Sequence, residues 1–363
     1  MTQTHLIDTA PVRFSPVAVY AGPTRRGRPP QHSRQGDFMR LIRRTLAVGV
    51  AAVLTLTACG TSDTTSSSSS GNGLEKTTLK VGTIPVPDSA PLQVAIDRGF
   101  FKAEGLEVQP EVVAGGAVAT QKLLGGSLDV SLGAYVGTFL AQDKGAGKFK
   151  YVADSYGAAP GAFVIMVKKD SPIKTVADLK GKTIAVNVLN SVSQLTAEVQ
   201  MKVAGVTATP DQFVEKKFPD MPAALENGQV DAAAMTEPVI TVESKAGGRI
   251  IVDEMTGPTE SLPIAGWFTT DAIASKYPKA IAAFQRALGK AQALVAKDRK
   301  IVEETLPKYT KIDAATAAVI SLGSYPTSLS ETRLQRVADL MKEYGYLKND
   351  LDVKSMILPP PAS

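Results

Sequence analysis

The sequence predicts an α/β protein of two similar lobes, each built on a mainly parallel β-sheet. A repeated unit is the first observation: KLLGGSLDVSLGAY at Lys122–Tyr135 returns as ALENGQVDAAAMTE at Ala224–Glu237, and Asp129 matches Asp231. The second is the alternation of strand-like and helix-like segments around both copies, which is typical of βαβ units. The third is the length of 363 residues, more than one domain usually needs. Two similar lobes predict a cleft between them.

The chain before the lobes divides into three parts. Residues 1–38 are rich in Pro, Arg, Gly and Ser, and we interpret them as a disordered stretch from an over-long gene start; a genuine basic arm is the alternative. Residues 39–58 have the basic start and short uncharged run of a secretory signal peptide, too short to span a membrane. Residues 56–59, LTAC, resemble the bacterial lipobox, which predicts lipidation of Cys59. Residues 59–77 then form a flexible Ser/Thr/Gly-rich linker.

Charge and reactive side chains exclude several functions. The net charge of +5 comes from residues 1–59, which carry +6, so the remainder carries −1 and gives no reason to expect a nucleic-acid partner. Both histidines, His5 and His32, and the single cysteine, Cys59, also lie there. The body therefore lacks the residues for Ser-His-Asp or Cys-His catalysis, for zinc or iron–sulfur sites and for disulfides. We expect no catalytic residue, metal or cofactor.

Residues 78–162 are expected to form the first part of lobe one. A β-rich run at Leu79–Pro85 opens it, and Ser89 or Asp88 is expected to cap the helix that follows. The expected later elements are a helix over Pro91–Phe101, a strand over residues 105–113, a helix ending at Leu124 and a strand over Leu128–Gly133. This β-α-β-α-β order predicts parallel strands with right-handed crossovers.

Residues 163–264 repeat the pattern as lobe two. The chain is expected to cross to it near Pro160–Phe163 and to return over Leu262–Phe268. The expected strands are Lys182–Asn187, Phe213–Phe218, Ala232–Thr236 and Arg249–Val252, with helices from Ser191 or Ser193 to Val203 and over Asp220–Glu226. Glycines close these helices, as they do in the first lobe.

Residues 265–363 are expected to return to lobe one as helices. One apolar stripe at helical spacing is formed by Ile281, Phe284, Leu288, Ala291 and Val295. A second, formed by Leu334, Val337, Met341 and Tyr344, follows the capping-box pattern of residues 328–331 (SLSE) and ends at Gly345. Both stripes predict core packing.

Ligands of parallel α/β sheets bind beyond the carboxyl ends of the strands, so the strand-to-helix loops are the candidate site. Their helix starts supply free backbone N–H groups, their small residues allow close approach, and they contain no Lys or Arg. A carboxylate among them would suit an amine or a ring N–H. The preferred one is Glu237, whereas a helix cap or solvated charge is the favoured role of Asp88. Tyr135, Tyr156 and Trp267 are expected either to wall the ligand or to pack between the lobes. The candidate ligand-binding residues are Pro87, Asp88, Ser89, Gly115, Gly116, Ala134, Tyr135, Asn187, Ser191, Ser193 and Glu237.

Four motifs carry a family resemblance: LQVAIDRGFFKAEGLEV, QKLLGGSLDVSLG, DSPIKTVADLKGKTIAV and AALENGQVDAAAMTEP. With the lipobox they resemble solute-binding lipoproteins of ABC importers, of the nitrate/sulfonate/taurine and thiamine-precursor (pyrimidine) type, from about Leu79 to Leu347. The resemblance implies a type II periplasmic-binding-protein fold, with two lobes, a hinge and C-terminal helices on lobe one. It implies capture of a solute by hinge closure and delivery to a permease with its ATPase. The protein would be a monomer, anchored by its N-terminal lipid on the outer face of the cell membrane.

The expected solute is a small nitrogen- or sulfur-containing organic molecule, such as an aminosulfonate, a sulfonate or a pyrimidine. Two other functions stay open. An enzyme on the same fold, similar to pyrimidine synthases, would depend on the His and Cys-rich motif that the body lacks. A ligand-sensing domain is the other alternative.

Overall fold

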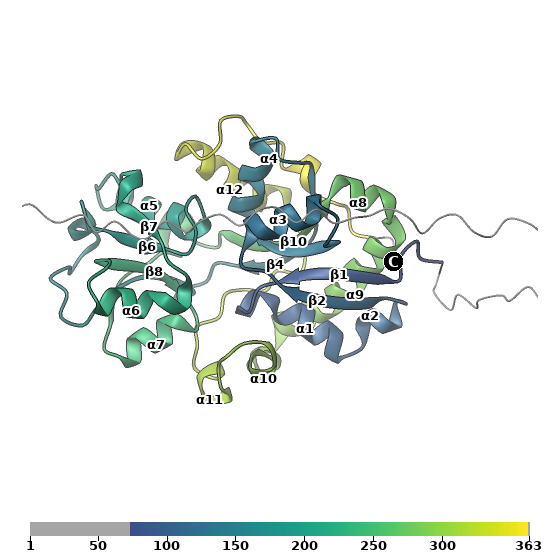
Figure 1. The fold of residues 1–363 in the computed structure, drawn as a ribbon, viewed down its shortest axis with the longest axis horizontal. Helices are drawn as coiled ribbons and strands as arrows, with labels where there is room; N and C mark the ends of the chain where they lie inside the picture. The colour runs from purple at the N-terminus through teal and green to yellow at the C-terminus, as the bar shows by residue number, and fades with distance from the viewer. Residues whose placement is uncertain (1–72, 362–363) are drawn as a thin grey trace, which may run out of the picture. The chain divides into compact units, whose positions relative to one another are not determined.

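The computed structural model describes residues 73–361, which form two β-sheets of five strands each (Figure 1). The expectations for residues 1–38, for the signal peptide 39–58 and for lipidation of Cys59 lie outside the described residues, as does most of the linker 59–77. Within residues 73–361, the search for a helix with the length and hydropathy of a membrane span finds none.

The first sheet has the strand order β2-β1-β3-β10-β4. Its strands are β1 (Thr78–Thr83), β2 (Glu107–Val112), β3 (Val130–Ala134), β4 (Phe149–Gly157) and β10 (Pro263–Thr270). β1 pairs in parallel with β2 and β3, whereas β10 is antiparallel to β3 and β4. The sheet is mixed: four of its strands run in one direction, and only β10, which enters from the second sheet, runs against its neighbours.

The second sheet has the strand order β7-β6-β8-β5-β9. Its strands are β5 (Phe163–Val167), β6 (Ile184–Val186), β7 (Phe213–Glu215), β8 (Ala232–Thr236) and β9 (Arg249–Asp253). Here the strand that arrives from the other sheet is β5, which is antiparallel to β8 and β9, while β6 is parallel to β7 and β8. In both sheets, therefore, four strands run in one direction and the incoming strand runs against them.

Helices surround both sheets (Figure 1). The α-helices are α1 (Ala90–Asp97), α2 (Phe100–Ala103), α3 (Gly116–Leu124), α4 (Tyr135–Asp143), α5 (Val192–Val203), α6 (Met221–Glu226), α7 (Val239–Lys245), α8 (Asp271–Lys276), α9 (Pro278–Lys297), α10 (Arg299–Tyr309), α11 (Ala314–Ala317) and α12 (Glu331–Glu343). Short 3-10 helices are η1 (Pro87–Ser89), η2 (Val176–Leu179), η3 (Pro210–Gln212), η4 (Phe218–Asp220), η5 (Gly257–Thr259) and η6 (Lys354–Met356). α9 packs against α1 and α2 under the first sheet, and α12 packs against α4.

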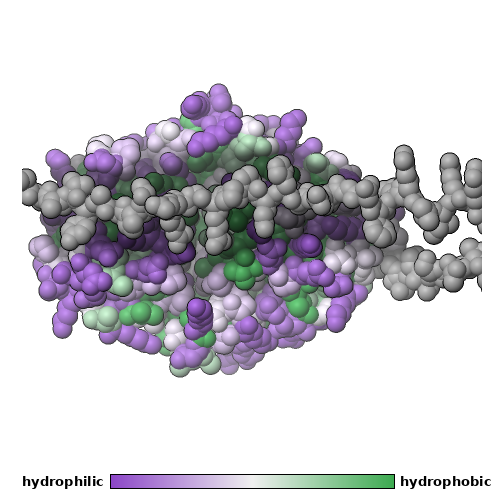
Figure 2. Space-filling model, in the orientation of Figure 1, coloured by the Kyte–Doolittle hydropathy of each residue, from purple (hydrophilic) through white to green (hydrophobic). Residues whose placement is uncertain are grey.

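The interior follows the predicted periodicities. The stripe of α9 is confirmed as core, since Ile281, Phe284, Leu288 and Ala291 are fully buried, and the Phe284 ring stacks on Phe101 at 5.3 Å between centroids. In β5, alternate residues enter the apolar clusters on opposite faces of the second sheet, as strand geometry requires. The visible outer face is mostly hydrophilic with small hydrophobic patches (Figure 2).

Two helix boundaries differ from the predictions. The helix expected over residues 91–101 is divided into α1 and α2, because Gly99 adopts a left-handed conformation (φ +71°) that the helix cannot continue through. The capping-box residue Ser328 is not the N-cap of α12. Ser330 takes that position, and its hydroxyl accepts the Arg333 backbone N–H at 3.4 Å, while the Ser328 carbonyl accepts the Arg333 guanidinium at 2.7 Å.

Candidate functional site

The strand register brings the ends of the parallel strands towards the crossovers between the sheets. β10 begins opposite the carboxyl end of β4, at Pro263 and Gly157, and its Ala265 pairs with Ala134 at the end of β3. In the second sheet, β5 begins opposite the carboxyl ends of β8 and β9. The two crossovers are short, five and nine residues between the strands they join. The carboxyl ends of both sets of parallel strands therefore lie beside the crossovers, where the site is predicted.

The loop after β1 is held through three consecutive backbone carbonyls. The Tyr309 hydroxyl donates to the Val86 carbonyl at 3.0 Å, and the Tyr325 hydroxyl donates to the Pro87 carbonyl at 3.0 Å. The carbonyl of Asp88 accepts from the Ser155 hydroxyl at 2.7 Å. These donors lie far apart in sequence, on β4, at the end of α10 and before α12. We call this arrangement the hydroxyl clamp.

The carboxyl group of Asp88 is half-buried, yet protein atoms crowd around it. Burial raises its pKa to about 7, and its own backbone N–H offsets part of that effect. Burial also raises the pKa values of Tyr156, Tyr309 and Tyr325, and the nearby charge of Asp88 raises them further.

The other predicted residues of this loop are buried. Pro87 lies in η1, and Ser89 is 2 % exposed. The Ser89 hydroxyl donates to the Ile84 carbonyl at 2.6 Å and accepts from the Thr83 hydroxyl at 2.7 Å. Ser89 occupies the N-cap position of α1 without making the side-chain cap bond that was expected of Ser89 or Asp88. Its hydroxyl fixes the turn instead.

The N-terminus of α3 is open to the outside of the protein, whereas the first-turn residues Val192, Ser193 and Gln194 of α5 are buried. Gly115 and Gly116 are half-buried at the start of α3, and a Cβ added to either would meet no atom within 4 Å. Neither helix has a side-chain cap bond, so first-turn N–H groups stay available for a ligand. α5 packs against α4, which places its apolar face between the two lobes.

Asn187, Ser191 and Ser193 form one cluster before and within the first turn of α5. The Ser193 hydroxyl donates to the Asn187 side-chain oxygen at 2.8 Å, and the Ser191 hydroxyl does so at 3.2 Å. Ser193 is fully buried, whereas Asn187 and Ser191 are half-buried. With its oxygen occupied, the Asn187 amide presents its NH2 group, which makes no hydrogen bond within residues 73–361.

Tyr135 is a core residue, and this corrects its expected place on a cleft wall. It is fully buried, its ring lies 4.6 Å from that of Tyr151, and its hydroxyl donates to Asp154 at 2.8 Å. Asp154 also accepts from the Arg333 guanidinium at 2.8 Å. Ala134, the N-cap of α4, is the half-buried residue at this junction. Trp267 is fully buried as well, so neither ring offers surface to a ligand.

Glu237 is buried, and its oxygens are already occupied. One oxygen accepts the Ser321 backbone N–H and the Thr241 hydroxyl, each at 3.0 Å, and the other accepts the Thr241 backbone N–H at 3.0 Å. Only 3 % of the residue is exposed. Because Ser321 belongs to the chain that returns to the first sheet, Glu237 connects the second lobe to it.

A segment that sequence reasoning missed joins these parts. Residues 321–325 bind Glu237 through Ser321, pair with Gly157 through Ser324, and reach the Pro87 carbonyl through Tyr325. The Tyr156 hydroxyl accepts the Gly323 backbone N–H. No local motif marks this segment, because each partner lies more than 80 positions away in sequence.

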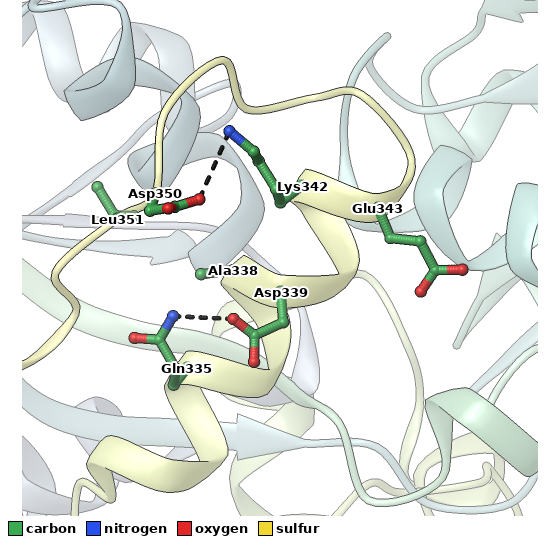
Figure 3. A pocket seen from close by; sticks show the side chains of 7 residues that line it. All are labelled: Gln335, Ala338, Asp339, Lys342, Glu343, Asp350 and Leu351. Carbon is green, nitrogen blue, oxygen red and sulfur yellow. Dashed lines mark hydrogen bonds and ion pairs between the residues drawn. The ribbon is translucent and has the colours of Figure 1, made fainter.

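In the described part of the chain, neither a metal site nor the cavity beside α12 coincides with the strand-end loops. Within residues 73–361, no group of three or more Asp and Glu side chains is arranged to hold a metal ion. A cavity of about 440 Å³ lies beside α12 (Figure 3) and is lined by Gln335, Ala338, Asp339, Lys342, Glu343, Asp350 and Leu351. Its polar groups pair locally, Gln335 with Asp339 at 2.9 Å and Lys342 with Asp350 at 3.5 Å, while Glu343 points away and pairs with Lys202 on α5. None of them belongs to a strand-end loop.

Comparisons with known proteins give a family match and close structural likenesses. The model of the family described as "NMT1/THI5 like" matches residues 86–300. A putative ABC transporter periplasmic binding protein of Brachyspira hyodysenteriae is 27 % identical over 226 residues, 58 % of this chain and 62 % of that protein, so less than two thirds of its length is spanned. A putative aliphatic sulfonates-binding protein of Escherichia coli is 27 % identical over 207 residues, 55 % of this chain and 64 % of that protein.

Solved structures show the same fold. The alkanesulfonate-binding protein SsuA from Xanthomonas axonopodis pv. citri, bound to MOPS, aligns with a TM-score of 0.65 at 21 % identity, covering 78 % of this chain and 98 % of that one. The periplasmic nitrate-binding protein NrtA from Synechocystis aligns with a TM-score of 0.64 at 16 % identity, covering 78 % and 86 %. These likenesses confirm the predicted periplasmic-binding-protein fold.

Proposed function

Because the chain belongs to the NMT1/THI5-like family, we propose that it is the solute-binding component of an ABC importer. The solute would be a small nitrogen- or sulfur-containing organic molecule, such as an aminosulfonate, a sulfonate or a pyrimidine. Relatives and structural neighbours named as binding proteins for aliphatic sulfonates and nitrate support this class of solute. Their names do not identify this chain's own solute.

The observation that carries the proposal is a set of donors that the protein does not use itself. The N-termini of α3 and α5 lack side-chain caps, and the Asn187 amide presents its NH2 group beside α5. Neutral donors and helix dipoles stabilise the oxygens of a sulfonate or the acceptors of a heterocycle. The loops after β1, β2, β3, β6 and β8 carry no Lys or Arg, which suits a solute that is neutral or zwitterionic, whereas Lys216 and Lys217 follow β7.

Capture would proceed by closure of the two lobes around the crossovers. Residues 158–162 and 254–262 connect the sheets, and a ligand that contacts loops of both lobes favours the closed form. The proposed contacts come from Pro87, Asp88 and Ser89, from Gly115, Gly116 and Ala134, and from Asn187, Ser191 and Ser193; buried Ser89 and Ser193 would act by shaping the loops. The earlier candidates Tyr135 and Glu237 are given supporting positions instead.

The proposed setting is extracytoplasmic. The signal-peptide pattern of residues 39–58 and the lipobox pattern at Cys59 support a protein anchored by its N-terminal lipid to the outer face of the cell membrane. The proposed partners are the solute and a permease with its ATPase. The protein would act as a monomer, without nucleic acid, metal or cofactor.

An enzyme of the pyrimidine-synthase type is the second candidate, favoured by the family's "THI5" name. Such an enzyme is expected to need His and Cys-rich residues, and the sequence after Cys59 has neither. A ligand-sensing domain is the third candidate. Product turnover would distinguish the enzyme from a binding protein. Permease and ATPase genes beside this one would favour the binding protein over both alternatives.

The test is a thermal-shift screen of the body from residue 73, followed by calorimetry. The panel contains sulfonates, aminosulfonates, pyrimidines, nitrate and sulfate. We expect saturable one-to-one binding of an organic member, and we expect Asn187→Ala to weaken it about tenfold while the exposed variant Lys300→Ala leaves it unchanged. Product turnover without saturable binding would assign the protein to the enzymes.

A further inference from the structure

The two candidate carboxylates, Glu237 and Asp88, differ in how many hydrogen bonds they already accept from the protein. Glu237 already accepts three hydrogen bonds, from Ser321 and Thr241, and is 3 % exposed. Asp88 is half-buried, and its carboxylate accepts no hydrogen bond from any other residue of 73–361. Apart from its own backbone N–H, this carboxylate has no donor, and burying it so costs free energy that a ligand supplying a further donor recovers. Of the two acids, Asp88 is therefore the one built to meet a solute.

The position of Asp88 is fixed without using its carboxylate. The hydroxyl clamp holds the carbonyls of residues 86–88, and its three hydrogens, from Ser155, Tyr309 and Tyr325, all go to backbone oxygens. None of them is left for the Asp88 side chain. A loop tied from three separate elements keeps its side chain in place before the ligand arrives, which lowers the entropy cost of binding.

Positive charge from the protein is also lacking at this carboxylate. No Lys or Arg contributes to the pKa of Asp88. Arg299 is near enough to lower the pKa values of Tyr156 and Tyr325, but its guanidinium is committed to Glu303 at 2.5 Å and to the Ile320 carbonyl at 2.7 Å. The surroundings are tyrosines, whose rings tolerate a cation at their faces.

We propose that the Asp88 carboxylate binds a positively charged nitrogen of the solute. The inference rests on the proposed function and narrows it to small organic amines and aminosulfonates. The ammonium group would occupy the Asp88 side of the site, and an acidic or polar end would meet the donors at α3 and α5. By binding the ammonium group, Asp88 would make the protein prefer an aminosulfonate over a plain sulfonate of the same length.

The proposal makes binding depend on pH. Burial raises the pKa of Asp88 to about 7, and a cation binds only the ionised form. The ionised fraction falls about tenfold between pH 8 and pH 6, so the affinity is expected to fall about tenfold. The tyrosines facing Asp88 do not titrate in this range, because burial raises the pKa values of Tyr156, Tyr309 and Tyr325.

Calorimetry on the body from residue 73 tests the proposal with matched probes. The pairs are taurine with ethanesulfonate, 3-aminopropanesulfonate with propanesulfonate, and benzylamine with benzyl alcohol, and nitrate is added alone. We expect an amine to bind at least tenfold more tightly than its partner at pH 8. Asp88→Asn is expected to abolish both this preference and the pH dependence. Asp211→Asn is the matched control, since Asp211 also follows a proline in a 3-10 turn but is exposed before β7.

The outcomes separate the inference from the proposed function. If a partner that lacks the amine, or nitrate, binds wild type as tightly as the amines, the role of Asp88 is overturned while a binding protein remains. If no member binds saturably, both are overturned. If Asp88→Asn folds poorly, the proposal is tested by the pH dependence of amine affinity in the wild-type protein. Tyr325→Phe provides a second variant. It keeps the carboxylate but loosens its loop, so amine affinity is expected to fall several-fold with the pH dependence kept.

Discussion

Asp129 and Asp231, 102 positions apart, hold the same backbone position in the two sheets. The Asp129 carboxylate accepts the Lys80 backbone N–H at 2.8 Å, and the Asp231 carboxylate accepts that of Thr183 at 2.9 Å. Each aspartate returns its own N–H to the carbonyl of the same partner, at 2.8 and 2.9 Å. The repeated Asp is therefore a latch that ties the third parallel strand of each lobe to its first strand.

The two latches are expected to differ in strength. Asp129 is 5 % exposed and pairs with Lys76 at 2.6 Å, whereas Asp231 is exposed. Asp129→Ala should lower the free energy of unfolding by about 2–3 kcal/mol, because a buried charged hydrogen bond is lost. Asp231→Ala should lower it by about 1 kcal/mol or less, because water replaces the carboxylate. Urea unfolding of both variants checks this, and equal losses would contradict it.

Asp88→Asn is expected to stabilise the protein at alkaline pH. The folded pKa of about 7 lies above the ordinary value of 3.8, so the native state holds more protons than the unfolded state between these values. Stability therefore falls as pH rises through this window, and the penalty is complete above pH 7. Removing the carboxylate should raise Tm at pH 8 and leave it nearly unchanged at pH 4.

The prediction is checked by thermal unfolding of wild type and variant at pH 4 and at pH 8. Asp211→Asn should shift Tm at neither pH, since the Asp211 side chain is exposed. A rise in Tm of equal size at pH 4 and pH 8 would show that the effect of Asp88→Asn is one of packing and not of charge.

Glu237→Ala is expected to destabilise the protein more than it weakens solute binding. The substitution leaves the N–H groups of Ser321 and Thr241 without their acceptor in a buried place. The cost should be about 2–4 kcal/mol, measured as a change in the urea midpoint. Thr241→Val, which removes only one hydroxyl bond to Glu237, should cost about 1 kcal/mol.

The opposite pattern would return Glu237 to the solute site. If Glu237→Ala unfolds at the wild-type urea concentration but binds solute more than tenfold more weakly, its oxygens face the ligand and not Ser321. Calorimetry on the folded variant distinguishes a structural role of Glu237 from a role in binding the solute.

Tyr135→Phe is expected to lower stability without changing solute affinity. The hydroxyl donates to Asp154 at 2.8 Å inside the core, and the Ser155 backbone N–H and the Arg333 guanidinium remain as partners of that carboxylate. Loss of one buried hydrogen bond should cost about 1–2 kcal/mol, while the dissociation constant stays within twofold of wild type. A weakened affinity at unchanged Tm would place Tyr135 at the ligand after all.

Much of the fold could be predicted from local signals. The bounds of β8 agree with the predicted strand, Ala232–Thr236, because a left-handed glycine at Gly228 (φ +64°) ends α6 before it, as Gly126 (φ +71°) ends α3 before β3. The antiparallel directions of β5 and β10 were not predicted, since strand direction depends on where the chain re-enters a sheet. Periodicity carries no information about that.

The sequence could not show which carboxylate of the candidate site is free. It favoured Glu237 over Asp88 because Glu237 lies beside a proline at a strand end. Our proposal prefers Asp88, because of partners that only the folded chain brings near: Ser321 lies 84 positions from Glu237, and Tyr325 lies 238 positions from Pro87. Whether a carboxylate is free or occupied is a property of such distant contacts.

The hydroxyl clamp has a consequence for how solute preference can change. Tyr309 and Tyr325 follow residue 300, where the family match ends, yet they hold the loop that carries Asp88. Substitutions in that C-terminal stretch can tilt the loop without altering Asp88 itself. If Asp88 meets the solute as proposed, the choice of solute can therefore be changed, or redesigned in the laboratory, through the supporting tyrosines alone.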